Sequence, residues 1–231
     1  MAPLQVRTTI SMDYADVERW LPKSDVLISY CSGPYADEQQ SDAIEAWLQQ
    51  GGRWLALHGS AGGRAIRMNP EGTVRKFVKQ RFHDVLGCFF MNHPPIMHYN
   101  VHHVDGADHP MLTDVPSTFE VEDELYMVQL TDPENTTSFL QTEYVPEGEM
   151  LEEDYHFFMD FDPAPDGKTR VLGYERTVGE AGGGVVYIGP GHSNTTHRAD
   201  VDAWHDTWDN PAYKTLLSNG VDWACQRQFT G

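Results

Sequence analysis

The sequence predicts an α/β domain built on a parallel sheet. Two runs that are apolar at nearly every residue, 25–31 and 53–58, are typical of strands buried on both faces. Between them, residues 38–50 place apolar side chains at helical spacing and stop at a glycine pair, a common end signal of a helix. A strand, a helix and a strand in this order predict a right-handed crossover between two parallel neighbours.

The other elements of the first half follow from the same periodicities. We expect a strand over 5–10, a short helix over 14–21 and a longer helix over 72–87. The last of these rests on one apolar stripe, which is formed by Val74, Val78, Phe82 and Val85.

The second half is richer in strands. Residues 88–145 are β-rich and interrupted by prolines, while residues 146–169 are acidic and without periodicity, which predicts a surface insertion or loop. The glycine-rich stretch 170–192 predicts a hairpin of two strands, and 209–228 predicts an amphipathic closing helix. Its inward side chains are expected to be Tyr213, Leu216, Leu217, Val221 and Ala224. No repeat or linker divides the chain, so we predict a single domain over 1–231.

The composition argues against several classes of function. Thirty-five acidic against 16 basic residues give a net charge of −19, which disfavours binding to nucleic acid and to anionic membranes. The chain has no apolar run long enough to span a bilayer, and its start lacks the features of a secretory signal, so we expect a cytoplasmic protein. Its three cysteines are widely spaced, which predicts neither a zinc ribbon nor a disulfide framework.

Candidate site residues stand where predicted strands end. Ligands of an open parallel sheet bind outside the carboxyl ends of its strands. His58 and Ser60 follow one such strand, His93 follows another, and His192 follows the last. Because histidine can shuttle a proton near neutral pH or ligate a metal, His58 is predicted to be a general base or a metal ligand. The alternative is that His58 only forms a hydrogen bond with a neighbouring backbone group.

The acidic stretch EVEDELY at 120–126 holds one unusual carboxylate. On a strand, its three glutamates share one face, while Asp123 shares the other face with Val121 and Leu125. A carboxylate among inward apolar side chains is costly unless it is paired or binds a ligand, so Asp123 is a candidate site residue. The alternative is an acidic surface rim.

Several familiar catalytic motifs are absent from the sequence. It has no zinc-protease histidine spacing, no glycine-rich phosphate loop that opens a helix, and no G-x-S-x-G turn. We therefore expect no nucleotide cofactor and no α/β-hydrolase serine. Eleven histidines leave open a site assembled from separate loops, such as His58, His93 and His192 with a carboxylate, and with it a divalent metal ion.

Five stretches, taken together and in order, resemble the trehalose-utilisation (ThuA-like) family. They are GGRWLALHGS at 51–60, LGCFFMNHPP at 86–95, HPMLTDVPSTFEVEDELY at 109–126, GGGVVYIGPGH at 182–192 and NPAYKTLLSNGVDWAC at 210–225. The resemblance implies a flavodoxin-like fold, similar to class I glutamine amidotransferases, with a mostly parallel sheet, helices on both faces and here a β-rich insertion. His58 then stands at or beside the turn where those enzymes carry a cysteine, so cysteine-based acyl transfer is not expected.

The resemblance also implies a role in the catabolism of disaccharides such as trehalose, with oxidised (keto) sugars as a suggested substrate class. Five polar positions match the family: His58, His93, Asp123, Glu124 and His192. We expect His58 to act as general base or metal ligand, and Asp123 or Glu124 to orient it or to bind sugar hydroxyls. His192 would supply the second acid–base group or ligand.

Three side chains are expected to contact the sugar itself: Ser60, His93 and Trp204. Trp204 and Tyr126 could stack on a sugar ring, and Trp204 is the better candidate. Trp54, in the middle of an apolar run, is expected in the core.

Two other functions stay open at this point. One is a non-catalytic sugar-binding or regulatory module, and the other is a metal-dependent hydrolase with a substrate that is not a sugar. The resemblance implies a first strand–helix unit that precedes 5–10 and that we expect to be missing. A homo-oligomer is compatible with all of these functions.

Overall fold

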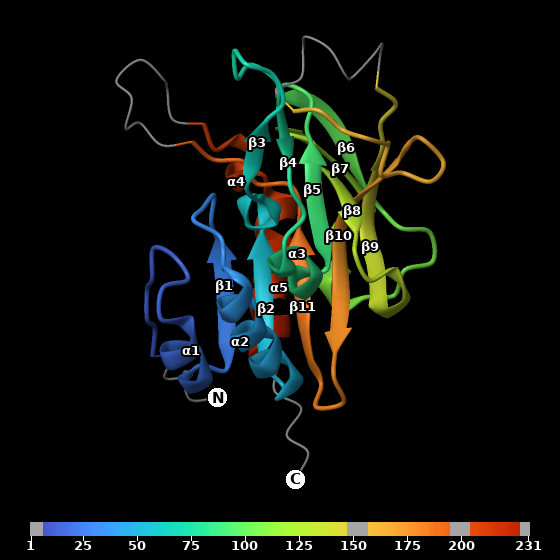
Figure 1. The fold of residues 1–231 in the computed structure, drawn as a ribbon. Coiled ribbons are helices and arrows are strands. Elements are labelled where there is room, and N and C mark those ends of the chain that lie inside the picture. Colours follow the sequence, from blue (N-terminus) through green and yellow to red (C-terminus); the bar gives the residue numbers. More distant parts are fainter. Residues whose placement is uncertain (1–6, 147–156, 195–203, 227–231) are drawn as a thin grey trace.

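A seven-stranded sheet in the order β1-β2-β11-β10-β9-β6-β7 organises the computed structural model, which describes residues 7–146, 157–194 and 204–226 (Figure 1). The fold is mixed α/β. The strands of this sheet are β1 (Val26–Tyr30), β2 (Arg53–Leu57), β6 (Met97–His103), β7 (Thr118–Asp123), β9 (Thr136–Glu143), β10 (Thr169–Val178) and β11 (Gly183–Ile188). Two small sheets pair β3 (Ala65–Arg67) with β4 (Arg75–Phe77) and β5 (Cys88–Asn92) with β8 (Met127–Leu130).

Parallel pairing is confined to one side of the large sheet. The strands β1 and β2 are parallel, as the strand–helix–strand order predicts, and β11 joins β2 in parallel. The four other neighbouring pairs are antiparallel. The expectation of a mostly parallel sheet therefore holds for three strands only. Among the described residues from 88 onward, no long crossover helix separates consecutive strands of the sheet, and neighbours run antiparallel.

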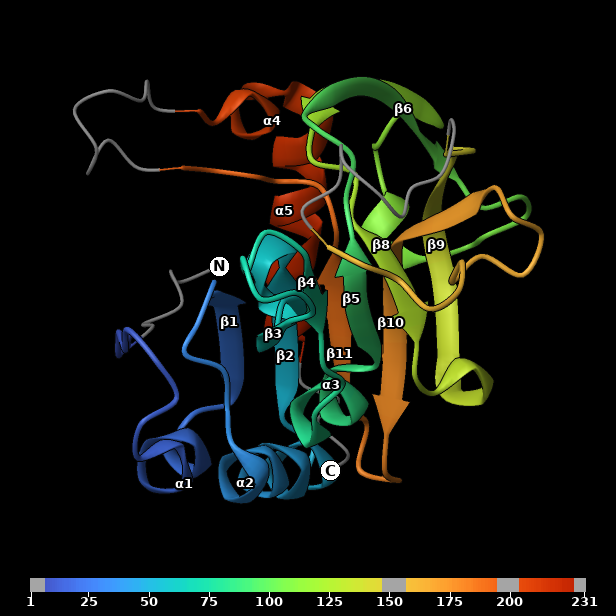
Figure 2. The same ribbon diagram turned by 45° about the horizontal axis from the view of Figure 1, so that its top comes forward.

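The main helices cover both faces of the parallel strands. In Figure 1 α2 (Glu38–Gln49) lies in front of them and α5 (Pro211–Cys225) lies behind, and the turned view of Figure 2 separates the two helices, with α2 below the strands and α5 higher up behind them. The side chain of Asp37 accepts the backbone N–H of Gln40 and so caps the start of α2. Smaller helices are α1 (Val17–Trp20), α3 (Arg81–Leu86) and α4 (Asp206–Asp209). In the described part of the chain, no helix is long and apolar enough to cross a membrane.

Side-chain alternation along β2 divides the core into two layers. Trp54 and Ala56 pack in the cluster that contains the apolar face of α2. Leu55 and Leu57 pack in the cluster that contains the inward face of α5. The side chains of β2 from Trp54 to Leu57 are buried on both faces of the strand, which confirms Trp54 as a core residue.

Four sequence-based expectations need correction or restriction. Residues 7–10 form no strand, and the rest of the expected strand 5–10 lies outside the described residues. The helix expected over 72–87 is only α3, and the stretch before it contains β4, because residues four apart share one face of a strand as well as of a helix. Within the expected loop 146–169, the described residues 157–168 hold no helix and no strand beyond a single bridge. On α5, Val221 is exposed and Trp223 is buried in its place.

The strand β1 is less covered than the sequence predicts. Ile28 and Tyr30 are exposed, although they lie in an apolar run. The reason is that β1 forms an edge of the sheet, and its burial alternates. Helix α5 packs more closely against β2 than against β1.

The junction of β11 with α2 requires glycine at one position. A methyl group at Gly183 would overlap the carbonyl oxygen of Leu48 at the end of α2. We expect Gly183→Ala to lower the free energy of unfolding by about 3 kcal/mol or more, because strand and helix must separate. Urea unfolding monitored by circular dichroism measures this change. In the control Gly106→Ala the methyl group meets nothing within 4 Å, and only the cost of its positive φ, about 1 kcal/mol, remains. Equal losses in both variants would contradict the close approach.

Candidate functional site

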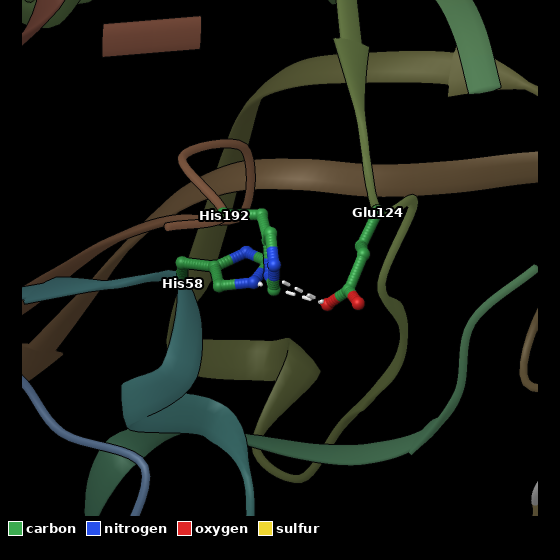
Figure 3. Close-up of side chains that lie close together, drawn as sticks. All are labelled: His58, Glu124 and His192. Carbon is green, nitrogen blue, oxygen red and sulfur yellow. Dashed lines mark ion pairs between the residues drawn. The ribbon is translucent and has the colours of Figure 1, made fainter. Parts of the chain in front are cut away.

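Three side chains from distant parts of the chain meet at the carboxyl edge of the sheet (Figure 3). His58 directly follows β2, Glu124 directly follows β7, and His192 comes shortly after β11. The Oε2 atom of Glu124 lies 2.9 Å from Nδ1 of His192 and 3.5 Å from Nε2 of His58. These are three of the four residues for which we predicted catalytic roles, and the roles themselves stay predictions.

The topology explains how the ends of β7 and β11 come together. Four antiparallel pairings separate the two strands, so both point the same way and both end at the same edge. The backbone N–H groups of Gly191 and His192 donate to the carboxylate of Asp123 at the end of β7. The sheet therefore curls enough to place these two ends in contact.

His58 is the most deeply buried of the three side chains. It begins a short 3-10 turn (His58–Ala61) with a positive φ of 32°, an uncommon conformation for a residue other than glycine. Its Nδ1 lies 2.7 Å from the carbonyl oxygen of Gly189. A carbonyl oxygen only accepts, so Nδ1 carries the proton and the lone pair of the neutral ring is on Nε2. Among the described residues this buried Nε2 atom has no hydrogen-bond partner.

The predicted alternative for His58, a hydrogen bond to neighbouring backbone, is thus present. This hydrogen bond involves only Nδ1 of the two ring nitrogens. The other nitrogen points toward Glu124, which lies too far away for a good hydrogen bond.

Asp123 lies beneath the site and holds its parts in place. The side chain is fully buried with Val121 and Leu125, as strand alternation predicts. Its carboxylate accepts the backbone N–H of Glu124 at 2.7 Å, of Gly191 at 2.7 Å and of His192 at 3.0 Å. Because backbone donors occupy the carboxylate, Asp123 is placed to position Glu124 and His192 rather than to contact a ligand.

The loop after β11 is fixed through its carbonyl groups. Gly189 accepts from His58, Pro190 accepts from the hydroxyl of Tyr213 at 3.1 Å, and Gly191 accepts from Nε1 of Trp208 at 2.9 Å. A side chain at Gly191 would overlap the Tyr213 hydroxyl, so the close approach requires glycine. His192 therefore starts from a rigid backbone.

Aromatic rings and one further histidine line the site. The ring centroid of Tyr126 lies 3.9 Å from that of His58, and the ring centroid of Tyr30 lies 6.2 Å from that of His58. His93 places Nδ1 3.9 Å from Oε1 of Glu124 and 2.8 Å from the carbonyl oxygen of Pro94. The side chains of His93, Glu124 and His192 are 17–18% exposed, against 2% for His58, so solvent reaches the site from their side.

The charges of the site support one another. Burial raises the pKa of Glu124, but the imidazoles of His192 and His58 and the charge of His93 outweigh it and hold this pKa far below its usual range. Burial lowers the pKa of His192, but its hydrogen bond to Glu124 and the charges of Glu124 and Asp123 raise it above its ordinary value. Burial lowers the pKa of His93 despite the nearby carboxylate. The arrangement thus favours a charged pair between Glu124 and His192.

Among the described residues, no hydrogen bond joins Ser60 or Trp204, both expected to contact a ligand, to the three side chains. Ser60 is fully buried, and its hydroxyl donates to the backbone carbonyl of Ser29 at 2.9 Å. The short turn directs this side chain back into the fold, so the prediction that Ser60 binds substrate has no support in its position. Trp204 pairs with Asn194 through backbone and amide hydrogen bonds, and among the described residues no contact joins it to the three side chains.

Sequence reasoning missed part of the surroundings. Tyr30 ends β1, whose carboxyl end lies at the same edge as that of β2, and this placement was the available signal. Trp208 is in contact with Tyr30 through an edge-on ring at 5.7 Å and with the backbone of Gly191. No pattern in the sequence connects Trp208 to this loop, since the contact depends on how α4 docks.

Replacing one oxygen of Asp123 tests its positioning role. Asp123→Asn leaves one acceptor oxygen and adds N–H donors that face backbone donors. We expect the free energy of unfolding to fall by about 3 kcal/mol, and the Gly191 and His192 amides to exchange with solvent about tenfold faster or more. The control is Glu120→Gln, whose exposed carboxylate pairs with exposed His98 and should change stability by less than about 0.5 kcal/mol. Unchanged exchange at both amides would refute the positioning role.

Comparison with known proteins identifies the family. The family model for ThuA, described as trehalose utilisation, matches residues 3–224. A ThuA-like protein from Bacteroides uniformis ATCC 8492 superposes with a TM-score of 0.59 at 18% identity, over 96% of this chain and 78% of that one. One from Parabacteroides merdae ATCC 43184 gives 0.57 at 16% identity, over 92% and 74%. These likenesses show the fold, and no curated protein matches significantly. The match over nearly the whole sequence confirms the resemblance: the chain belongs to the ThuA trehalose-utilisation family.

Proposed function

We propose that this protein binds a carbohydrate, a disaccharide or its keto derivative, at the carboxyl edge of the sheet and converts it by acid–base chemistry. The observation that carries the proposal is the convergence of His58, Glu124 and His192 from three distant segments onto one partly open site. Membership of a trehalose-utilisation family supports a carbohydrate-related role. We also propose that the fold is of the flavodoxin-like, class I glutamine amidotransferase-like type, and that keto sugars are among the substrates.

The chemistry of the three side chains suits a hydroxyl-rich ligand. A carboxylate accepts hydrogen bonds from sugar hydroxyls, and the second oxygen of Glu124, 3.9 Å from Nδ1 of His93, accepts no hydrogen bond within the described part of the chain. The unpartnered Nε2 of His58 can accept a proton from a hydroxyl or from a carbon next to a carbonyl, which is the role of a general base. His192, hydrogen bonded to Glu124, can return a proton as general acid.

The surroundings favour binding of a ring. Tyr126 and Tyr30 flank His58 and present aromatic surface beside polar groups, a common composition of small-molecule sites. Because the ring of Tyr126 lies against that of His58, Tyr126 is a stronger stacking candidate than Trp204. A cytoplasmic location and the lack of nucleic-acid and membrane partners remain predictions from the composition.

A turnover screen tests the function. Wild-type protein is incubated with trehalose, other disaccharides and their keto derivatives, and products are followed by chromatography while calorimetry measures binding. We expect at least one of these sugars to be converted, and Glu124→Gln to lower kcat/KM for it by about 100-fold or more. The loss is expected because the neutral amide no longer stabilises the proton on His192, the proposed general acid.

The matched control is His98→Ala. His98 is an exposed histidine whose ion pairs are with Glu120 and Glu122, away from the site, so its loss should leave turnover unchanged. Binding of a sugar without any product over long incubation would replace catalysis by a non-catalytic binding module. Neither binding nor conversion of any sugar in the panel would refute the carbohydrate proposal.

A further inference from the structure

One buried nitrogen of the site lacks the partner that its surroundings require. The side chain of His58 is 2% exposed, and its Nε2 is without a hydrogen bond among the described residues. A buried polar atom is nearly always satisfied by protein, water or a ligand. This atom is directed at a carboxylate and a second imidazole, and both of these groups are metal ligands in proteins.

The protein itself holds Nε2 away from Glu124. The backbone of Glu124 is anchored to Asp123, and its Oε2 is engaged by Nδ1 of His192 at 2.9 Å. The ring of His58 is fixed from the other side by Gly189. Closing the 3.5 Å gap would therefore strain contacts on both sides, whereas an ion between the groups would satisfy them all.

We propose that His58 Nε2, the Glu124 carboxylate and a ring nitrogen of His192 bind one divalent transition-metal ion, with Zn²⁺ as the best match. The inference uses the same site as the proposed function, but it does not require the ligand to be a carbohydrate. With the ion bound, Nε2 of His58 would be a ligand, and the activation of a hydroxyl group would pass from this nitrogen to the ion. Within residues 7–146, 157–194 and 204–226, no other group of three potential ligand side chains lies this close together.

The distances are compatible with such an ion. At bond lengths of about 2.0–2.1 Å, ligand atoms of a tetrahedral zinc site lie about 3.3 Å apart. Here the two measured separations from Glu124 Oε2 are 2.9 Å and 3.5 Å, and all three atoms fall within 4.8 Å of one another. Small side-chain rotations suffice to bring the three groups around one ion.

The outer contacts are those of a metal-bound histidine. Such a histidine donates its other N–H to a carbonyl or carboxylate, which fixes the tautomer and turns the lone pair toward the metal. The hydrogen bond from Nδ1 of His58 to Gly189 has this geometry. Asp123 supports the two other ligands through their backbone N–H groups.

The donor set decides the class of metal. Two imidazole nitrogens and one carboxylate suit zinc and its neighbours, whereas Ca²⁺ and Mg²⁺ prefer oxygen ligands only. Three protein ligands leave a position open, and the partly exposed side of the site, near Glu124 and His192, gives access to it. There the ion would polarise a hydroxyl or carbonyl oxygen of a bound molecule.

Metal titration in the absence of sugar tests the inference. The full chain is stripped with a chelator, and calorimetry with Zn²⁺ alone measures affinity and stoichiometry. We expect the wild type to bind about one equivalent of Zn²⁺ per chain. The affinity of His58→Ala for Zn²⁺ should be lower by a factor of about 100 or more. The visible spectrum of the Co²⁺-loaded protein should report nitrogen and oxygen ligands, and should be lost in the same variant.

Glu124→Gln keeps the shape of the side chain and provides a second test if His58→Ala unfolds. The control His98→Ala removes an exposed histidine and should bind Zn²⁺ as the wild type does. A wild-type protein that takes up no Zn²⁺, or a folded His58→Ala protein that binds it unchanged, overturns the inference. Metal binding without sugar turnover would support the inference and refute the proposed function, whereas sugar turnover by a wild-type protein that takes up no Zn²⁺ would do the reverse.

Discussion

The buried carboxylate of Asp123 is the contact on which the geometry of the candidate site depends. A carboxylate between Val121 and Leu125 is tolerated in the core only where hydrogen bonds replace the water that it has lost. Three backbone N–H groups do so, one from the next residue and two from the loop after β11. Because one side chain holds both segments, Glu124 and His192 are placed relative to each other before their own side chains meet.

This contact also explains why a mixed sheet builds one site. The parallel strands β2 and β11 deliver His58 and the loop of His192 to the same edge, as ordinary α/β topology requires. The antiparallel strands could have carried the end of β7 far away from that edge. Four antiparallel pairings lead from β11 to β7, and because this number is even the two strands run in the same direction. The curl of the sheet then brings the end of β7 close to the end of β11. The site therefore joins the two halves of the sheet.

The parts of the fold that local periodicity determines were predictable, and the parts that depend on docking were not. Helix α2 carries both an apolar stripe and end signals, and Asp123 stands out because alternation places it with apolar neighbours. The stripe at Val74 and Val78 fits a strand as well as a helix, so the sequence could not exclude β4. Glu124 was expected on the face of the other glutamates, but β7 ends one residue earlier and frees it to turn toward His58. The burial of Ser60 was not predictable from periodicity, because it lies in the tight turn after β2, where strand alternation no longer holds.

The backbone of His58 shows that this position is held for its side chain. A positive φ costs a residue with a Cβ atom about 1–2 kcal/mol, and glycine would avoid that cost. The surrounding structure stabilises the strained turn instead: Tyr187 donates to the carbonyl of His58 at 3.1 Å, and Gly189 accepts from its ring at 2.7 Å. A histidine needed only for packing would not require an unpartnered nitrogen beside Glu124. Strain that is retained where a simpler residue would fit is typical of functional sites, and here it directs Nε2 at the two other groups.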